Sequence, residues 1–157
     1  MTKEDKELSF KDLCARLPYD VKVCYENNTY YLNEINPACK EIMISVLIQD
    51  ENRQWCAESV LIENLKPYLR PMSSMTEEEL YELKTLCSIY IPTDSPTIGF
   101  EDYGIIVFTH HLTNNTYSFK LNIDIIDWLN SRHFDYRGLI ERGLAIEVTK
   151  ENNPYEK

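Results

Sequence analysis

The densest group of chemically active side chains in this sequence lies at residues 130–138. It contains the imidazole of His133, the carboxylate of Asp135 and the guanidiniums of Arg132 and Arg137. A histidine near a carboxylate can perform general acid–base catalysis, because imidazole exchanges a proton near neutral pH. The same residue types also suit an ordinary junction between two helices, with Asp135 as a helix cap. We favour this structural role and keep an enzyme that uses His133 and Asp135 as an alternative.

The pair His110-His111 is the other candidate for chemistry, as a metal site. Adjacent residues on a strand point to opposite faces of the sheet, so these two rings could share a metal ion only where the chain bends. No third ligand stands at a diagnostic spacing, and none of the five cysteines forms a CxxC pair. We therefore predict exposed polar residues of a hairpin here, and we expect no metal site and no cofactor.

Several catalytic motifs are absent from the sequence. The chain has only four glycines and contains no phosphate-binding glycine loop, no GxSxG motif, no HExxH motif and no EF-hand loop. We therefore assign no catalytic residue and expect a non-enzymatic protein. The eleven tyrosines favour an interaction protein, because tyrosine is enriched at protein–protein interfaces.

The sequence is acidic, and the acidity is concentrated in its second half. The formal net charge is −10, and residues 72–157 carry seven basic and fourteen acidic side chains. Such a surface repels phosphate groups, so direct binding of nucleic acid is not expected. Net charge of this size commonly serves solubility. A second alternative is an acidic inhibitor that mimics nucleic acid and blocks a DNA-handling enzyme, which requires carboxylates gathered on one exposed face.

The first half is predicted to hold a helix followed by short strands. Ser9 is expected to cap a helix that begins at Phe10 and ends near Arg16, before Pro18. Alternating or apolar segments separated by turn residues then predict strands at 21–25, 29–32, 42–48 and 54–60. Closely spaced strands of this kind indicate a small curled antiparallel sheet, and the specific expectation is an SH3-like partial barrel. The polar segments 1–7 and 151–157 are expected to fray.

The second half is predicted to mix helices with a hairpin. Its clearest signal is a capping box, in which the Thr76 hydroxyl accepts the Glu79 N–H and the Glu79 carboxylate returns the bond. The other expected elements are strands at 103–109 and 117–121, a helix capped by Asp124, a shorter helix from Asp135 to near Gly143, and a strand at 144–148.

Pro67 and Pro71 divide the chain, because neither can donate a backbone hydrogen bond inside a regular element. We predict an α+β protein with a β-rich first part, residues 1–71, and a second part of helices and a β-hairpin, residues 72–157. We expect the two parts to form one compact unit.

Three sequence blocks carry a family resemblance. They read LCARLPY at 13–19, KPYLRPMSSMTEE at 66–78, and DWLN followed by HFDYRGLI within 127–140. In these blocks and their order the chain resembles a family of small proteins encoded in phages, prophages and mobile elements of gut anaerobic bacteria. The resemblance implies a bacterial, accessory protein, and it brings no activity with it.

The lead expectation is an interaction protein of a phage or mobile element that binds a protein partner of unknown identity. The amino-terminal residues lack the apolar core of a signal peptide, and no apolar run approaches a membrane span, so we expect a cytoplasmic protein without a membrane partner. The residues chosen for a partner-binding patch are Tyr68, Arg70, Arg132, His133, Tyr136 and Arg137.

Overall fold

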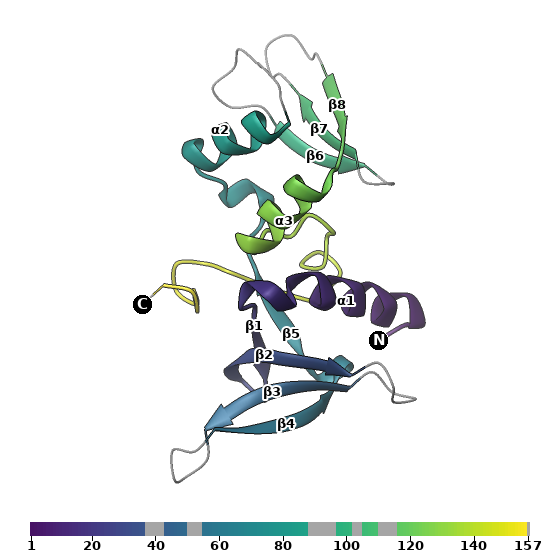
Figure 1. Ribbon diagram of the computed structural model, residues 1–157, viewed down its shortest axis with the longest axis vertical. Coiled ribbons are helices and arrows are strands. Elements are labelled where there is room, and N and C mark those ends of the chain that lie inside the picture. Colours follow the sequence, from purple (N-terminus) through teal and green to yellow (C-terminus); the bar gives the residue numbers. More distant parts are fainter. Residues whose placement is uncertain (37–42, 50–54, 88–96, 102–104, 110–115, 157) are drawn as a thin grey trace. The chain divides into compact units, whose positions relative to one another are not determined.

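The computed structural model describes residues 1–36, 43–49, 55–87, 97–101, 105–109 and 116–156. The described chain mixes α-helices with β-strands that are mostly antiparallel, which confirms the predicted α+β class (Figure 1). Its α-helices are α1 (Lys3–Arg16), α2 (Glu77–Leu86) and α3 (Ile123–Ser131). None of the described helices is both long and apolar enough to cross a membrane.

The described chain divides into two compact units. Unit 1 comprises residues Met1–Arg70 and Gly138–Lys157, and unit 2 comprises Pro71–Arg137. The predicted boundary after residue 71 lies one residue from this division. The prediction that residues 72–157 form one subdomain is wrong, because the last twenty residues return to unit 1. That the two units form one compact body stays a prediction.

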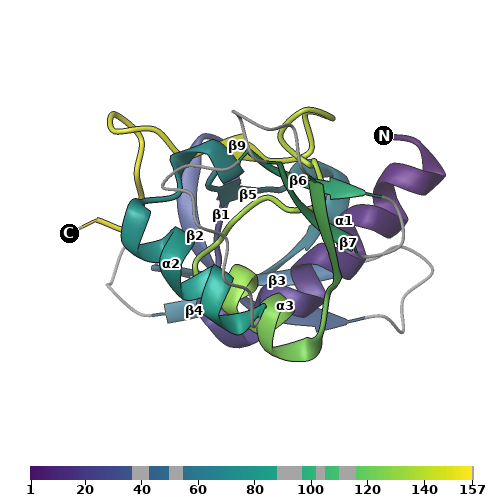
Figure 2. The ribbon, with the colours of Figure 1, turned by 90° about the horizontal axis from the view of Figure 1, so that it is seen from above.

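Unit 1 contains a six-stranded sheet in the order β4-β3-β2-β1-β5-β9. Its strands are β1 (Lys22–Tyr25), β2 (Asn28–Asn36), β3 (Met43–Gln49), β4 (Trp55–Leu61), β5 (Lys66–Leu69) and β9 (Ile146–Glu147). The first five pair antiparallel, with β5 returning to β1 after the 3-10 turn η2 (Ile62–Asn64), whereas β9 pairs with β5 in parallel. Strand β5 lies between β1 and β9 (Figure 2). The four predicted strands are confirmed as β1 to β4, and the SH3-like closure stays a prediction.

Helix α1 covers the core of unit 1 and begins earlier than predicted. Its cap is Thr2, whose hydroxyl accepts the Asp5 N–H while the Asp5 carboxylate accepts the Thr2 N–H. This capping box satisfies backbone donors that would otherwise be exposed at the helix start, so the predicted fraying of residues 1–7 is wrong. Ser9, the predicted cap, instead lies buried inside the helix. The helix ends at Arg16, as predicted.

The core of unit 1 joins α1 to the sheet. Leu13 on α1 packs with apolar side chains from the strands and from the connecting turns. Its buried members are Leu13, Val21, Val23, Leu32, Val60, Ile62 and Leu65. The same helix buries an ion pair, in which the Arg16 Nε donates to the Asp12 Oδ2 at 2.7 Å. Since water is excluded from both side chains, this pair is held by the packing around it.

Unit 2 places α2 and α3 next to a three-stranded antiparallel sheet (Figure 1). Its strands are β6 (Thr97–Glu101), β7 (Ile105–Thr109) and β8 (Thr116–Lys120), in the order β6-β7-β8. The predicted hairpin is confirmed as β7 and β8, and β6 was not predicted. The two helices pack through an apolar core. Its buried members are Leu80, Leu83, Ile125, Leu129, Phe134 and Tyr136.

Three helix starts were predicted after residue 71. One of them is confirmed and the other two are wrong. The predicted capping box of Thr76 and Glu79 is confirmed at the start of α2. Helix α3 is capped by Asn122, two residues before the predicted Asp124, because the Asn122 amide oxygen accepts the Ile125 N–H at 2.9 Å. The helix predicted from Asp135 to Gly143 is wrong. This segment forms turns, in which Gly143 takes the left-handed conformation, with φ of 68°.

Candidate functional site

The six residues of the predicted partner-binding patch fall into both units. Tyr68 lies in β5 and Arg70 directly follows that strand, in unit 1. The other four, Arg132, His133, Tyr136 and Arg137, follow α3 in unit 2. The six predicted residues therefore form two groups, one in each unit.

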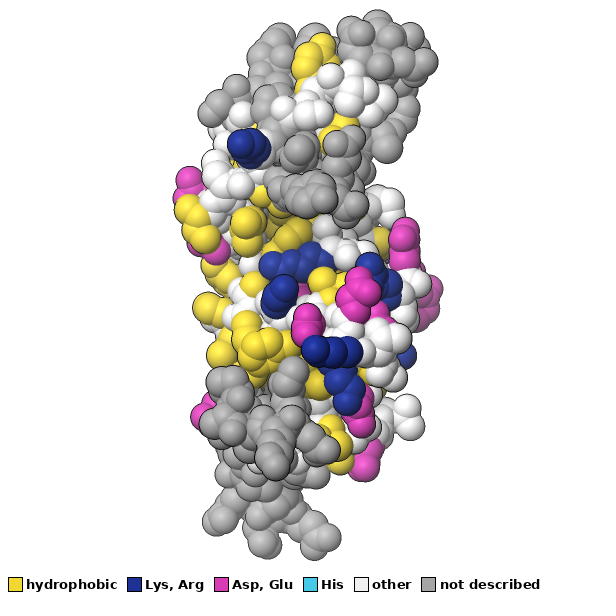
Figure 3. Space-filling view, turned by 90° about the vertical axis from the view of Figure 1, so that its right-hand side faces the viewer, with side chains coloured by type: hydrophobic (Ala, Val, Ile, Leu, Met, Phe, Trp, Pro, Cys, Tyr) yellow, Lys and Arg dark blue, Asp and Glu magenta, His cyan; other side chains and the backbone are white. Residues whose placement is uncertain are grey.

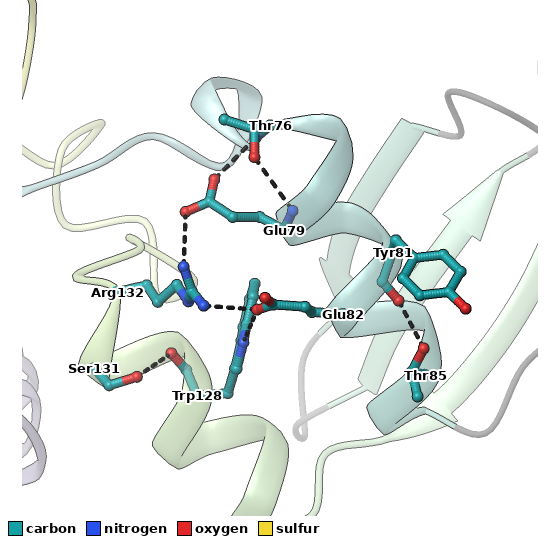
Figure 4. A network of polar contacts seen from close by, with 8 residues as sticks. All are labelled: Thr76, Glu79, Tyr81, Glu82, Thr85, Trp128, Ser131 and Arg132. Atoms are coloured by element: carbon teal, nitrogen blue, oxygen red, sulfur yellow. Dashed lines mark hydrogen bonds and ion pairs between the residues drawn. The ribbon is translucent and has the colours of Figure 1, made fainter.

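Arg132 stands at the centre of a polar network that joins α3 to α2 (Figure 4). Its Nη2 donates to the Glu82 Oε2 at 2.6 Å, and its Nη1 lies 3.6 Å from the Glu79 Oε1. The same Glu82 oxygen accepts the Trp128 indole N–H at 3.0 Å. The guanidinium also lies over the Trp128 ring, 5.2 Å from its centroid. Arg132 is thus used to hold two helices together, and its geometry indicates a structural role.

The chain following Arg132 turns sharply and carries the imidazole and carboxylate that could do acid–base chemistry. His133 has φ of 59°, in the left-handed region that non-glycine residues rarely adopt. Asp135 is only 8% exposed. The enzyme that uses these two residues stays an alternative prediction.

Tyr136 and Arg137 differ in what they could offer a partner. Tyr136 is only 8% exposed, and its hydroxyl donates to the Asn130 Oδ1 at 3.2 Å. It therefore packs inside unit 2 and presents almost no contact surface. Arg137 is half-buried, with its guanidinium 4.8 Å from the centroid of the Tyr136 ring. Of the four residues after α3, Tyr136 is buried, and the half-buried Arg132, His133 and Arg137 lie before and after it in the turn.

The outer face of α2 is a better candidate for contact, and the residue at its centre was not predicted. Tyr81 is 73% exposed, the largest fraction among the large hydrophobic side chains that the structure describes. The exposed positions Glu77, Glu78 and Thr85 lie one turn on either side of it. The signal was available in the sequence, because Leu80 and the other inward-facing leucines leave Tyr81 on the opposite side of the helix.

Unit 2 as a whole is acidic, and another of its exposed apolar side chains also lies among carboxylates. Ile123, the first residue of α3, is 67% exposed, and its helical neighbours Asp124 and Asp127 are exposed as well. Residues 71–137 carry ten acidic and four basic side chains, so unit 2 holds −6 of the total charge of −10. The apolar contact points of this unit are therefore surrounded by negative potential.

The candidates for metal or thiol chemistry gain no support from the described residues. No group of three or more His, Cys, Asp or Glu side chains in the described ranges is placed to hold a metal ion. The pair His110-His111 lies outside those ranges. Burial raises the pKa of the Cys87 thiol to about 11, which disfavours the reactive thiolate at neutral pH.

No protein-family model matches the chain, and the searches of curated proteins and of solved structures give no significant match either.

Proposed function

We propose that this chain is a non-enzymatic interaction protein that binds a basic protein surface through the outer face of α2. The observation that carries the proposal is the exposure of Tyr81 at the centre of an acidic helix face. A large aromatic ring gains free energy when a partner covers it, and tyrosine can also donate or accept a hydrogen bond there. A side chain this exposed contributes little to the stability of unit 2, so its ring is available for contact with a partner.

The charge of unit 2 determines which partners suit this face. Glu77 and Glu78, in the first turn of the same helix, stand one turn before Tyr81 and are exposed. Carboxylates around an apolar contact attract lysine and arginine side chains and repel acidic ones. The partner is therefore a protein with a basic patch, and the association weakens as salt rises.

We also propose that the protein works in the bacterial cytoplasm as an accessory factor of a phage or mobile element. The support is the resemblance of its three sequence blocks, at 13–19, 66–78 and 127–140, to proteins encoded in such elements.

The test begins with an affinity pull-down from host lysate, with and without nuclease, using the tagged wild-type chain, Tyr81→Ala and Tyr117→Ala. Tyr117 is a matched control, because it is a less exposed tyrosine on β8 of the same unit. A basic protein that survives nuclease is then purified, and its affinity for each variant is measured. We expect Tyr81→Ala to lose roughly tenfold or more in affinity, as for a contact of about 1.4 kcal/mol or more. Equal affinities for the wild type and Tyr81→Ala would sink the proposal.

A second candidate, an acidic mimic of nucleic acid, is favoured by the concentration of negative charge in unit 2. On the face drawn in Figure 3, however, the acidic side chains of the described residues stand next to basic ones. Mimicry predicts that the recovered partner is a DNA-handling enzyme and that added DNA displaces the chain. A partner that binds DNA and this chain at the same time would exclude mimicry and leave the first proposal standing.

A further inference from the structure

The strands β1 and β5 of unit 1 separate at a point where a tyrosine hydroxyl stands between them. The paired residues are Cys24 with Lys66 and Val23 with Pro67, so Lys22 and Tyr68 are next in register. Instead of a direct backbone bond there, the Tyr155 hydroxyl accepts the Lys22 N–H at 3.2 Å and donates to the Tyr68 carbonyl at 2.9 Å. We call this place the fork, defined by Lys22 and Tyr68.

The Lys22 side chain recognises the segment that carries this hydroxyl. Its ammonium donates a hydrogen bond to the Pro154 carbonyl. It also lies 5.0 Å from the centroid of the Tyr31 ring and 5.8 Å from that of the Tyr155 ring. The fork thus contacts three features of the segment, which are the Pro154 carbonyl, the face of the Tyr155 ring and the Tyr155 hydroxyl. Burial raises the pKa of Tyr155, so its hydroxyl remains a donor at neutral pH.

The segment itself, residues 149–156, is here called the strap. It is ordered by short-range bonds of its own: the Asn152 Oδ1 accepts the Thr149 N–H at 2.7 Å, and the Asn153 Oδ1 accepts the Tyr155 N–H at 3.0 Å. A further bond, from the Asn152 Nδ2 to the Glu147 carbonyl at 2.9 Å, connects the strap to β9. The contacts with Lys22, in contrast, join residues more than a hundred positions apart. The fork therefore holds a segment that is distant from it in the sequence.

We propose that the fork is a binding slot for the segment Asn153-Pro154-Tyr155, which fills it in cis, and that the same segment of a second copy of this chain fills it in trans. The second copy is the partner because it carries the carbonyl and phenol at the spacing that the fork recognises. Exchange of an identical segment is a low-cost route to a dimer, since every contact of the closed form is made again. This inference concerns unit 1 and is independent of the proposed role of α2.

The test mixes two full-length variants with complementary defects. Tyr155→Ala keeps the fork and loses the phenol, whereas Lys22→Glu keeps the strap and loses the ammonium that holds it. Native mass spectrometry of the equimolar mixture is expected to show a heterodimer at roughly ten times the abundance of either homodimer, as for at least one regained hydrogen bond. Tyr117→Ala mixed with Lys22→Glu is the control, because Tyr117 lies on β8 and not on the strap. Absence of a heterodimer between two variants that are folded by circular dichroism would overturn the proposal.

A second measurement covers the case in which one variant does not fold. A fluorescent peptide of residues 147–156 is titrated into the full-length Tyr155→Phe chain and into the wild type. We expect tighter binding to Tyr155→Phe, whose own strap competes less well, and weaker binding of a peptide in which phenylalanine replaces the tyrosine. A folded Tyr155→Phe chain that binds neither peptide would overturn the slot. Peptide binding without any heterodimer from folded variants would overturn the assignment to a second copy.

Discussion

Arg16 and Asp12 form an ion pair that is completely hidden from water, with the Nε donating to the Oδ2 at 2.7 Å across one turn of α1. An exposed pair at this spacing would contribute only a few tenths of a kcal/mol. Inside the protein, the free energy lost in desolvating both groups opposes their attraction. Removing one partner therefore destabilises the fold strongly, whereas replacing both with apolar side chains can leave the stability unchanged. This contrast leads to a prediction about single and double substitutions.

We expect Asp12→Ala to destabilise the protein by about 3–5 kcal/mol, because it leaves the buried Arg16 guanidinium without its carboxylate. The double variant Asp12→Leu, Arg16→Met removes both charges while keeping apolar volume, and should recover much of that loss. Urea denaturation of the wild type, the single variants and the double variant checks this. A double variant that is as unstable as the sum of the single ones would contradict it.

Tyr155→Phe is expected to lower the free energy of unfolding by about 1–3 kcal/mol, because the fork keeps a backbone donor and acceptor that the phenol had satisfied. Tyr81→Phe is the matched control, since the Tyr81 side chain is largely exposed. Its hydroxyl can bond to water with or without the fold, so we expect almost no change. Equal changes in the free energy of unfolding for the two substitutions, measured by thermal denaturation, would show that the Tyr155 hydroxyl does not stabilise the fork.

Glu82→Gln and Glu82→Leu should separate the two bonds that the Glu82 carboxylate accepts. The amide oxygen of glutamine can still accept the Trp128 N–H, whereas leucine cannot. Because the Arg132 and Glu82 side chains are partly exposed, we expect losses of at most about 1 kcal/mol for Glu82→Gln and more for Glu82→Leu. Fluorescence in a Trp55→Phe background reports on Trp128 alone. An unchanged emission spectrum in Glu82→Leu would contradict the observed indole bond.

The Cys87 thiol should react slowly with iodoacetamide. Since burial raises its pKa from 9.0 to about 11, the thiolate fraction at pH 8 is roughly a hundredfold below that of an unperturbed thiol. The rate should therefore keep rising as pH passes 9, where the rate for an ordinary thiol levels off. Peptide mass spectrometry over a range of pH follows this residue separately from the other cysteines. A plateau near pH 9 would show that Cys87 is not shielded.

The sequence predicted best where the local signal was complete. Alternation of apolar residues separated by turns identified β1 to β4, and the Thr76–Glu79 spacing identified the start of α2. Each of these elements is specified by residues within a few positions of one another. Strand β5 was not predicted, because Pro67 marked its segment as a break, yet Pro67 lies within β5 and pairs with Val23 of β1.

The errors arose where distant contacts overrule local appearance. Residues 151–157 are polar and read as a fraying end, yet Tyr155 is held by backbone groups of Lys22 and Tyr68. Likewise, Asp135 has the residue type of a helix cap, but the following chain is used to return to β5. At the candidate site, the clustering of reactive side chains suggested Arg132 and Tyr136 as partner-binding residues. In the structure both side chains are bound to other residues of unit 2. No local pattern reveals that a side chain is committed to a contact 50 residues away.

The discontinuity of unit 1 has a consequence for how the chain folds during synthesis. Residues 71–137 leave the ribosome as one uninterrupted stretch and can complete their own core while unit 1 still lacks β9 and the strap. The Tyr155–Tyr68 bond spans 87 residues, so the nascent chain closes it only after unit 2 has been made. Until then the fork is open, and slow long-range closure exposes it to neighbouring nascent chains on the same messenger RNA. If straps exchange between copies as proposed above, polysomes are the setting in which two copies would meet with open forks.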